Sequence, residues 1–372
     1  MKINQSFLLL LLSTITSTGS VSAFSAVSPD MTRSRLKEAL CSPSGKLTLS
    51  PELIIPEPTD PTALLLKSTE VTKVSERIRT SAKANVAFIE GSIGSLRSFA
   101  AEQENARGQF PSPVPVVFTG IAPGSDDAVD LDEAADAGVS GIIVSVLNGK
   151  AISTVQDLID QEDGSLKDQC EKALASRLQP IPEVFLVGGT QWEEEDVVKL
   201  VDVLTEKCGD AGEPVSVVLT IDAPEESDDD EEGSEDEEAK AAFLPKVPKA
   251  LGKRVPIIGS VKVPAGGGRM SQYTKLMKES GFTGAYLRAD CVPGFRMNPD
   301  LEAVGGFWCA AIGDLKSVKS KNFSFRSKVQ LDKDVPLEWY NYQKNIMESG
   351  ALGDFSGPAQ DVNSDAGDYL GF

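Results

Sequence analysis

The sequence predicts a parallel α/β fold and favours a (β/α)8 barrel of the TIM type, which can be irregular in places. Three observations support this fold class. Strand-like and helix-like segments alternate from about residue 45 onward, which is the order that builds a parallel sheet. The strand-like segments are continuous apolar runs, as expected where helices cover such a sheet. The 372 residues suit one barrel with an N-terminal targeting segment and a C-terminal extension.

The expected elements follow from hydrophobic periodicity. The first helix is typical, because Val71, Val74 and Ile78 recur at helical spacing and Asp60-Pro61 is a favourable start. Helices are expected at residues 60–84, 96–106, 130–138, 154–178, 193–207 and 271–280. Strands are expected at residues 85–90, 114–119, 142–146, 183–187, 215–221, 255–261 and 284–287.

A further strand at residues 47–55 is indicated more weakly. With it, eight strands would close a barrel, whereas seven strands are also compatible with an open doubly wound sheet. No G-x-G-x-x-G motif follows the first strand, which disfavours a dinucleotide-binding domain.

The N-terminus has the features of a targeting segment. Lys2, the apolar run from Phe7 to Leu12 and the small residues Val21-Ser22-Ala23 predict a signal peptide over residues 1–23. The stretch from Val21 to Ala26 resembles the cleavage motif of plastid precursors in diatoms and related algae. That resemblance implies a transit peptide over residues 24–44 and a location in the plastid stroma. An ordinary secreted protein is the alternative.

Composition excludes several kinds of chemistry and partner. The net charge of -20 argues against nucleic acid or an anionic membrane as the partner of the processed chain. The absence of histidine removes the usual general base and histidine metal sites. We expect neither a metal nor another cofactor. The spacing of the cysteines predicts free thiols rather than a disulfide framework or a zinc site: Cys41, Cys170, Cys208, Cys291 and Cys309.

We therefore predict a barrel domain over residues 45–303, followed by an extension over residues 304–372. An acidic insert at residues 224–240 interrupts the barrel and is expected to be a disordered loop. The extension combines basic residues with aromatic ones, a composition that can bind single-stranded nucleic acid. The acidity of the whole chain favours aromatics that pack on the barrel instead.

The region from Asn85 to Asp290 resembles the ribulose-phosphate-binding barrels, and indole-3-glycerol-phosphate synthase in particular. The similarity lies in Val86-Ala-Phe-Ile-Glu90, in Val114 to Thr119, and in the Ala-Gly-Val-Ser-Gly junction that precedes the strand at residues 142–146. The resemblance implies that residues 86–90 form the first barrel strand and that Glu90 is catalytic. It also implies that a second strand is missing between Gly91 and Pro113.

The chain departs from that family at most catalytic positions. The family's catalytic lysine falls at Thr119, and its other charged positions fall at Ser92, near Gly188 and at about Ser260. Loss of the lysine removes the cation needed for ring closure. We therefore expect that the chain is not an active indole-3-glycerol-phosphate synthase.

The candidate site lies on the loops after the strands, where barrels carry their function. The glycine-rich loop after the strand at residues 255–261 can present N–H groups to an anion. The predicted phosphate-binding residues are Lys262, Gly266, Gly267, Gly268, Arg269 and Arg288. Glu90 and Asp222 stand at other strand ends and are the predicted acid/base pair.

Two functions remain open. One is a lyase or isomerase that acts on a phosphorylated small molecule. The other is a non-catalytic plastid barrel, a binding or assembly factor that contacts a protein partner through its C-terminal extension. The missing catalytic groups favour the second. It predicts an exposed apolar patch around Phe307, Trp308, Trp339 and Tyr342.

Overall fold

The barrel is closed. A computed structural model describes residues 29–42, 45–55, 63–120, 130–160, 164–209, 212–222, 244–262, 270–289 and 301–317 of the chain. Its strands are hydrogen-bonded in parallel in chain order, and the last pairs with the first. The predicted TIM-type barrel is therefore confirmed, and the open sheet is excluded. The strands are β1 Thr48–Ile55, β2 Ala87–Gly91, β3 Val116–Phe118, β4 Gly141–Ser145, β5 Gln179–Leu186, β6 Val217–Asp222, β7 Ile257–Lys262 and β8 Gly284–Leu287.

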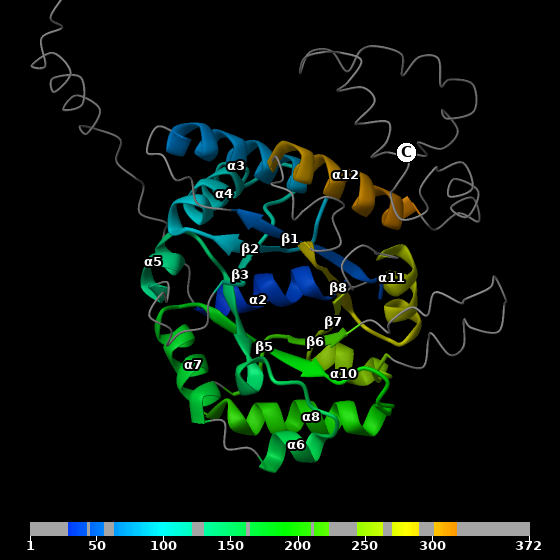
Figure 1. Cartoon of the computed structure of the whole chain (residues 1–372). Helices are drawn as coiled ribbons and strands as arrows, with labels where there is room; N and C mark the ends of the chain where they lie inside the picture. Colours follow the sequence, from blue (N-terminus) through cyan, green and yellow to red (C-terminus); the bar gives the residue numbers. More distant parts are fainter. Residues whose placement is uncertain are drawn as a thin grey trace, which may run out of the picture.

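Helices surround this ring of strands (Figure 1). The helix expected at residues 154–178 is two helices, α6 and α7, and α7 begins at Gly164, a residue that disfavours a helix interior. None of the described helices combines the length and apolar character of a membrane span. A short 3-10 helix, η1 Val146–Gly149, follows β4. The helices outside the ring are α3 Ala63–Thr80, α4 Ile93–Asn105, α5 Leu131–Asp136, α6 Val155–Asp160, α7 Gly164–Ala175, α8 Glu194–Lys207, α10 Lys249–Arg254, α11 Met270–Glu279 and α12 Leu301–Ser317.

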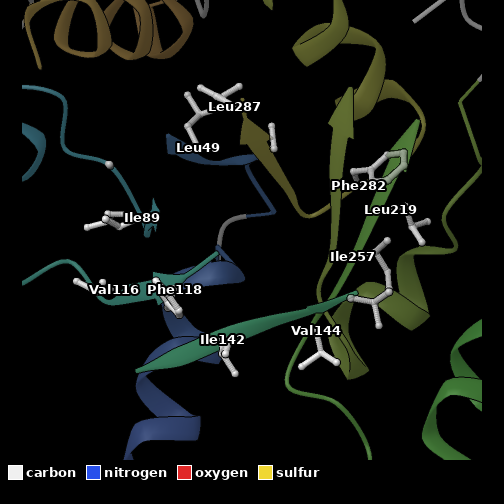
Figure 2. Close-up of a cluster of buried hydrophobic side chains, with 14 of the residues drawn as sticks. Leu49, Ile89, Val116, Phe118, Ile142, Val144, Leu219, Ile257, Phe282 and Leu287 are labelled. Atoms are coloured by element: carbon white, nitrogen blue, oxygen red, sulfur yellow. The ribbon is translucent and has the colours of Figure 1, made fainter. Parts of the chain in front are cut away.

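The alternation of strand side chains produces two cores. Outward-facing residues such as Ile89, Ile142 and Leu219 pack in the layer between the strands and the helices (Figure 2). Inward-facing residues fill the lumen, among them Phe88, whose ring stacks on Tyr286 with centroids 4.1 Å apart. A filled lumen is usual for a barrel of eight strands.

A helix that precedes β1 closes the amino-terminal end of the barrel. This helix, α2 Pro29–Leu40, lies in the middle of the ring in Figure 1. Its Leu36 and Leu40 are fully buried in the inner core. Lys37 donates to the carbonyl of Arg254 at 2.6 Å, and Thr48 Oγ1 donates to the carbonyl of Leu40 at 3.1 Å.

The position of α2 corrects one expected boundary. A transit peptide over residues 24–44 would be removed on import. Its removal would also remove α2, which fills the amino-terminal end of the barrel. The barrel therefore begins at or before Pro29 rather than at residue 45. The predicted signal peptide at residues 1–23 lies outside the described residues.

The strand numbering implied by the family resemblance is wrong. The segment that ends at Glu90 is β2, because β1 precedes it and pairs with it between Ile54 and Glu90. No strand is missing between Gly91 and Pro113, since β2 pairs directly with β3 and the intervening segment forms α4. The weakly indicated strand at residues 47–55 is β1, which closes the ring against β8.

The expected start of the C-terminal extension also shifts. Helix α12 runs through the predicted boundary at residues 303 and 304, and it packs on α3 and β1. Phe307 and Trp308 are fully buried, and the indole Nε1 of Trp308 donates to the backbone carbonyl of Glu52 at 3.1 Å. These two aromatics therefore belong to the barrel core and form no exposed patch.

Candidate functional site at the carboxyl-terminal mouth

The predicted site residues that the structure describes lie at or next to the carboxyl ends of their strands, at one end of the barrel. Glu90 is the penultimate residue of β2, Asp222 ends β6 and Lys262 ends β7, and all three are exposed. Asp222 and Lys262 are register partners on adjacent strands. Because β2 and β6 are four strands apart in a ring of eight, Glu90 and Asp222 face each other across the mouth.

Arg288, directly after β8, turns into the lumen below this mouth. Its guanidinium forms an ion pair with Glu183 of β5. The same group donates to Ser260 Oγ at 2.9 Å and to Thr220 Oγ1 at 3.2 Å. Thr220 in turn donates to Glu183 at 2.6 Å. The guanidinium of Arg288 thus contacts polar side chains of three other strands.

Glu52 of β1 is the second buried carboxylate of this network. Tyr286 Oη donates to its Oε1, and the backbone N–H of Ala289 donates to its Oε2 at 2.8 Å. The guanidinium of Arg288 lies 3.6 Å from Oε1. A buried carboxylate needs such partners, because an unpaired charge in the interior is strongly unfavourable.

Burial and charge in this network shift two acidities. Burial raises the pKa of Tyr286 well above its usual range, and the Glu52 charge adds to the effect while Arg288 opposes it. Tyr286 therefore stays protonated and acts as a donor. Partial burial also raises the pKa of Glu90, and the charge of Glu52 raises it further. Glu90 is thus held closer to protonation than an ordinary glutamate.

The two described members of the predicted phosphate site have different surroundings. Lys262 is exposed, with its Nζ 4.2 Å from the centroid of the Phe185 ring. Arg288 points at carboxylates, so a phosphate group would have to compete with Glu183 and Glu52 for it. Gly266, Gly267, Gly268 and Arg269 lie outside the described residues. The phosphate role of this loop stays a prediction.

The positions at which the chain departs from the resembling family have identifiable roles here. Ser92 caps α4, because its Oγ accepts a hydrogen bond from the N–H of Ser95 at 3.3 Å. Ser260 accepts from Arg288. Thr119 follows β3, and its buried Oγ1 has no hydrogen-bond partner among the described residues. A buried hydroxyl without a partner is uncommon in folded proteins.

Sequence reasoning missed Glu52, Glu183 and Tyr286. Each lies within a strand at an inward-facing position. The signal was a charged residue inside an apolar strand. In β5 this signal is obscured, because Glu183 stands at the start of the predicted strand rather than inside it. The strand in the structure begins at Gln179 and includes Pro180 and Pro182. Pro51 obscured β1 in the same way.

Within the described part of the chain, no group of three or more acidic or thiol side chains is placed to hold a metal ion. The described side chains at and below the mouth carry carboxyl, hydroxyl, ammonium and guanidinium groups. Such groups can bind polar ligands and transfer protons.

Comparison with known proteins gives structural neighbours only. No family model matches the chain, and no curated protein matches it. Triosephosphate isomerase from Bartonella henselae is 12% identical, with a TM-score of 0.34, and the match covers 65% of this chain and 92% of that one. A mutant tryptophan synthase alpha-subunit from Pyrococcus furiosus is 15% identical, with a TM-score of 0.39 and coverage of 72% and 97%. Rhizobium etli pyruvate carboxylase is 10% identical, with a TM-score of 0.43 and coverage of 87% and 32%. The architecture rests on the strand pairing itself, which is that of a (β/α)8 TIM-type barrel.

Proposed function

We propose that this chain is a barrel enzyme of the lyase or isomerase type, which binds a phosphorylated small molecule at its carboxyl-terminal mouth. In this proposal Glu90 moves the proton, Asp222 faces it across the mouth, and Lys262 holds the anionic group together with the loop that follows. The proposal chooses the enzyme over the non-catalytic alternative.

The observation that carries the proposal is the environment of Glu90. This carboxyl is exposed at the mouth, yet its pKa is raised by partial burial and by the charge of Glu52. A carboxyl with a raised pKa exchanges its proton more readily near neutral pH. Perturbed carboxyls at the mouth of a barrel are candidates for acid/base catalysis.

The arrangement of charges supports this role. Arg288 is shared between Glu52 and Glu183. Glu52 therefore stays in place as a buried charge that acts on Glu90 from below. Lys262 stands on the exposed rim, where its ammonium can meet an anion without leaving a buried carboxylate unpaired.

The alternative of an assembly factor loses part of its support. It predicted an exposed apolar patch that included Phe307 and Trp308, and both are fully buried. Trp339, Tyr342 and the rest of the extension after Ser317 lie outside the described residues. A protein partner that binds there is compatible with either function.

Two probes test the proposal on the full chain. Inorganic phosphate, titrated by calorimetry, should bind wild type and bind Lys262→Ala at least about 10-fold more weakly. Lys253→Ala is the matched control, because Lys253 is an exposed lysine on α10, which precedes β7 and so stands at the other end of the barrel. Equal phosphate binding by both variants would argue against Lys262.

The proton-transfer step is tested separately with ribulose 5-phosphate in deuterated water. Wild type should catalyse exchange of the carbon-bound hydrogen next to the carbonyl, and Glu90→Gln should lose about 100-fold or more of that rate. Glu206→Gln, on the exposed side of α8, is the control. An exchange rate unchanged by Glu90→Gln would remove Glu90 from the catalytic role.

We also propose that the chain is imported into a plastid and processed before Pro29. The residues from Val21 to Ala26 support import, and the packing of α2 in the barrel floor supports the processing position. Residues 1–28 fused to a fluorescent protein should direct it to the plastid. Secretion of that fusion would contradict the proposal.

A further inference from the structure

Two cysteine thiols meet away from the barrel mouth. Cys170 lies in α7 and Cys208 caps the carboxyl end of α8. The Sγ of Cys170 donates to the Sγ of Cys208 across 3.5 Å, although 38 positions separate the two residues in the chain. Neither forms a disulfide bond, and both are buried.

The chain turns directly after Cys208, at the end of α8. Gly209 follows with a φ of +61°, in the left-handed region that favours glycine. A Cβ at Gly209 would lie 2.8 Å from Cε of Lys167, which belongs to α7. The residue after Cys208 therefore lies close to the side chain of Lys167, which is flexible and can move aside.

We propose that Cys170 and Cys208 form a redox-active dithiol, which a small-molecule disulfide such as oxidised glutathione converts to an intramolecular disulfide. The sulfurs stand about 1.5 Å farther apart than in a disulfide bond, so side-chain rotation and a small helix movement suffice. The other described cysteines, Cys41 and Cys309, have hydrogen bonds to backbone carbonyls rather than to a second thiol.

The reaction balances as a pair of thiol exchanges. The Cys208 thiolate attacks one sulfur of the small disulfide and releases one small thiol, which takes up the proton lost from Cys208. The Cys170 thiolate then attacks Sγ of Cys208 and releases the second thiol, which takes up the other proton. The protein loses two protons and two electrons, and the small disulfide gains them.

The direction of the hydrogen bond between the two thiols favours Cys208 as the attacking thiol. The hydrogen bond from Cys170 lowers the pKa of Cys208, while burial opposes this change. A thiolate is the reactive form in disulfide exchange. Burial shields both sulfurs, so reaction requires transient opening at the end of α8.

A disulfide here would fasten two helices that flank β5 in the chain. That strand carries Glu183 and Phe185 of the mouth region, and α7 packs on it. Oxidation should therefore raise the Tm of the chain by about 5–10 °C. This inference is independent of the proposed enzymatic function.

The test is oxidation of the full chain with glutathione disulfide, followed by peptide mapping without reduction. We expect one crosslinked pair of peptides that contain Cys170 and Cys208, with the mass loss of two hydrogen atoms. Cys309→Ser should keep the crosslink, whereas Cys170→Ser should give a glutathione adduct on Cys208 instead. The Tm gain should disappear in Cys170→Ser.

A second condition distinguishes slow access of glutathione disulfide to the buried thiols from an incorrect choice of cysteine pair. The oxidation is repeated in urea below the unfolding midpoint, where local opening exposes α8. A crosslink that forms there and persists after dilution supports the proposal. Free thiols, two separate adducts on wild type, or a crosslink to a different cysteine under this condition would overturn it.

Discussion

The guanidinium of Arg288 forms an ion pair with Glu183 in the barrel lumen, and the same group lies 3.6 Å from the carboxylate of Glu52. The two carboxylates come from β5 and β1, which are four strands apart in the ring. One buried cation thus holds opposite walls of the barrel together. This arrangement fixes Glu52 in place beneath Glu90.

Replacing Arg288 should be strongly destabilising. Arg288→Met leaves Glu52 and Glu183 buried without their cation, and such losses lower the free energy of unfolding by about 3–5 kcal/mol. Urea denaturation measures the effect. Arg177→Met is the control, because it breaks the exposed ion pair with Asp136 and should cost less than about 1 kcal/mol. Similar losses in the two variants would mean that the lumen network contributes little.

Glu90→Gln should stabilise the chain at neutral pH. The native pKa of Glu90 is raised above its ordinary value of 4.5, so the native state binds this proton more tightly than the unfolded state does. Stability therefore falls as pH rises from about 4.5 through the native pKa, and the loss is complete above it. Glu90→Gln has no ionisable group at this position, so its free energy of unfolding does not fall in this way.

The pH dependence of this difference is the measurement. The two chains should unfold with similar free energies below about pH 4, where Glu90 is protonated in both states. The difference should grow between about pH 4.5 and the native pKa, and stay constant above it. A variant that is less stable than wild type at about pH 7 would show that the ionised carboxylate is favourably placed.

Leu36→Ala should weaken the barrel, although the residue lies in a segment with the composition of a transit peptide. Leu36 is fully buried in the inner core, and truncation of such a leucine costs about 2–5 kcal/mol. Leu131→Ala, at a partly buried position on α5, should cost less. A chain that begins at residue 45 should be less stable than one that begins at residue 29, as judged by Tm.

Helix α12 should be required for a stable barrel. A chain that ends at residue 303 loses Phe307 and Trp308, and with them the indole hydrogen bond to Glu52. It should unfold at a markedly lower Tm than a chain that ends at residue 317. Equal melting of the two chains would place α12 outside the cooperative core.

Much of the fold could be predicted from sequence, because apolar β-branched runs separated by amphipathic segments specify a parallel sheet covered by helices. The strand at residues 284–287 coincides with β8. What could not be predicted is how the ends pack. Nothing local in Arg33 to Leu40 shows that this segment fills the lumen, since its burial depends on contacts with Val215, Ile258 and other distant residues.

The site was predictable only at its exposed rim. Strand ends are visible in the sequence, and Glu90, Asp222 and Lys262 were found there. The network beneath them depends on which strand faces which across the ring. Arg288 meets Glu183 only because the barrel closes. That closure requires β1 to be a strand, which Pro51 disfavours in the local sequence.

The most direct test of the proposed mouth is the pKa of Glu90, measured by carbon-13 NMR of its carboxyl in wild type and in Glu52→Gln. We expect a wild-type value above 4.5, and a lower value in the variant, because a neighbouring negative charge has been removed. A wild-type carboxyl that titrates at its ordinary value, or one that does not respond to Glu52→Gln, would contradict the account.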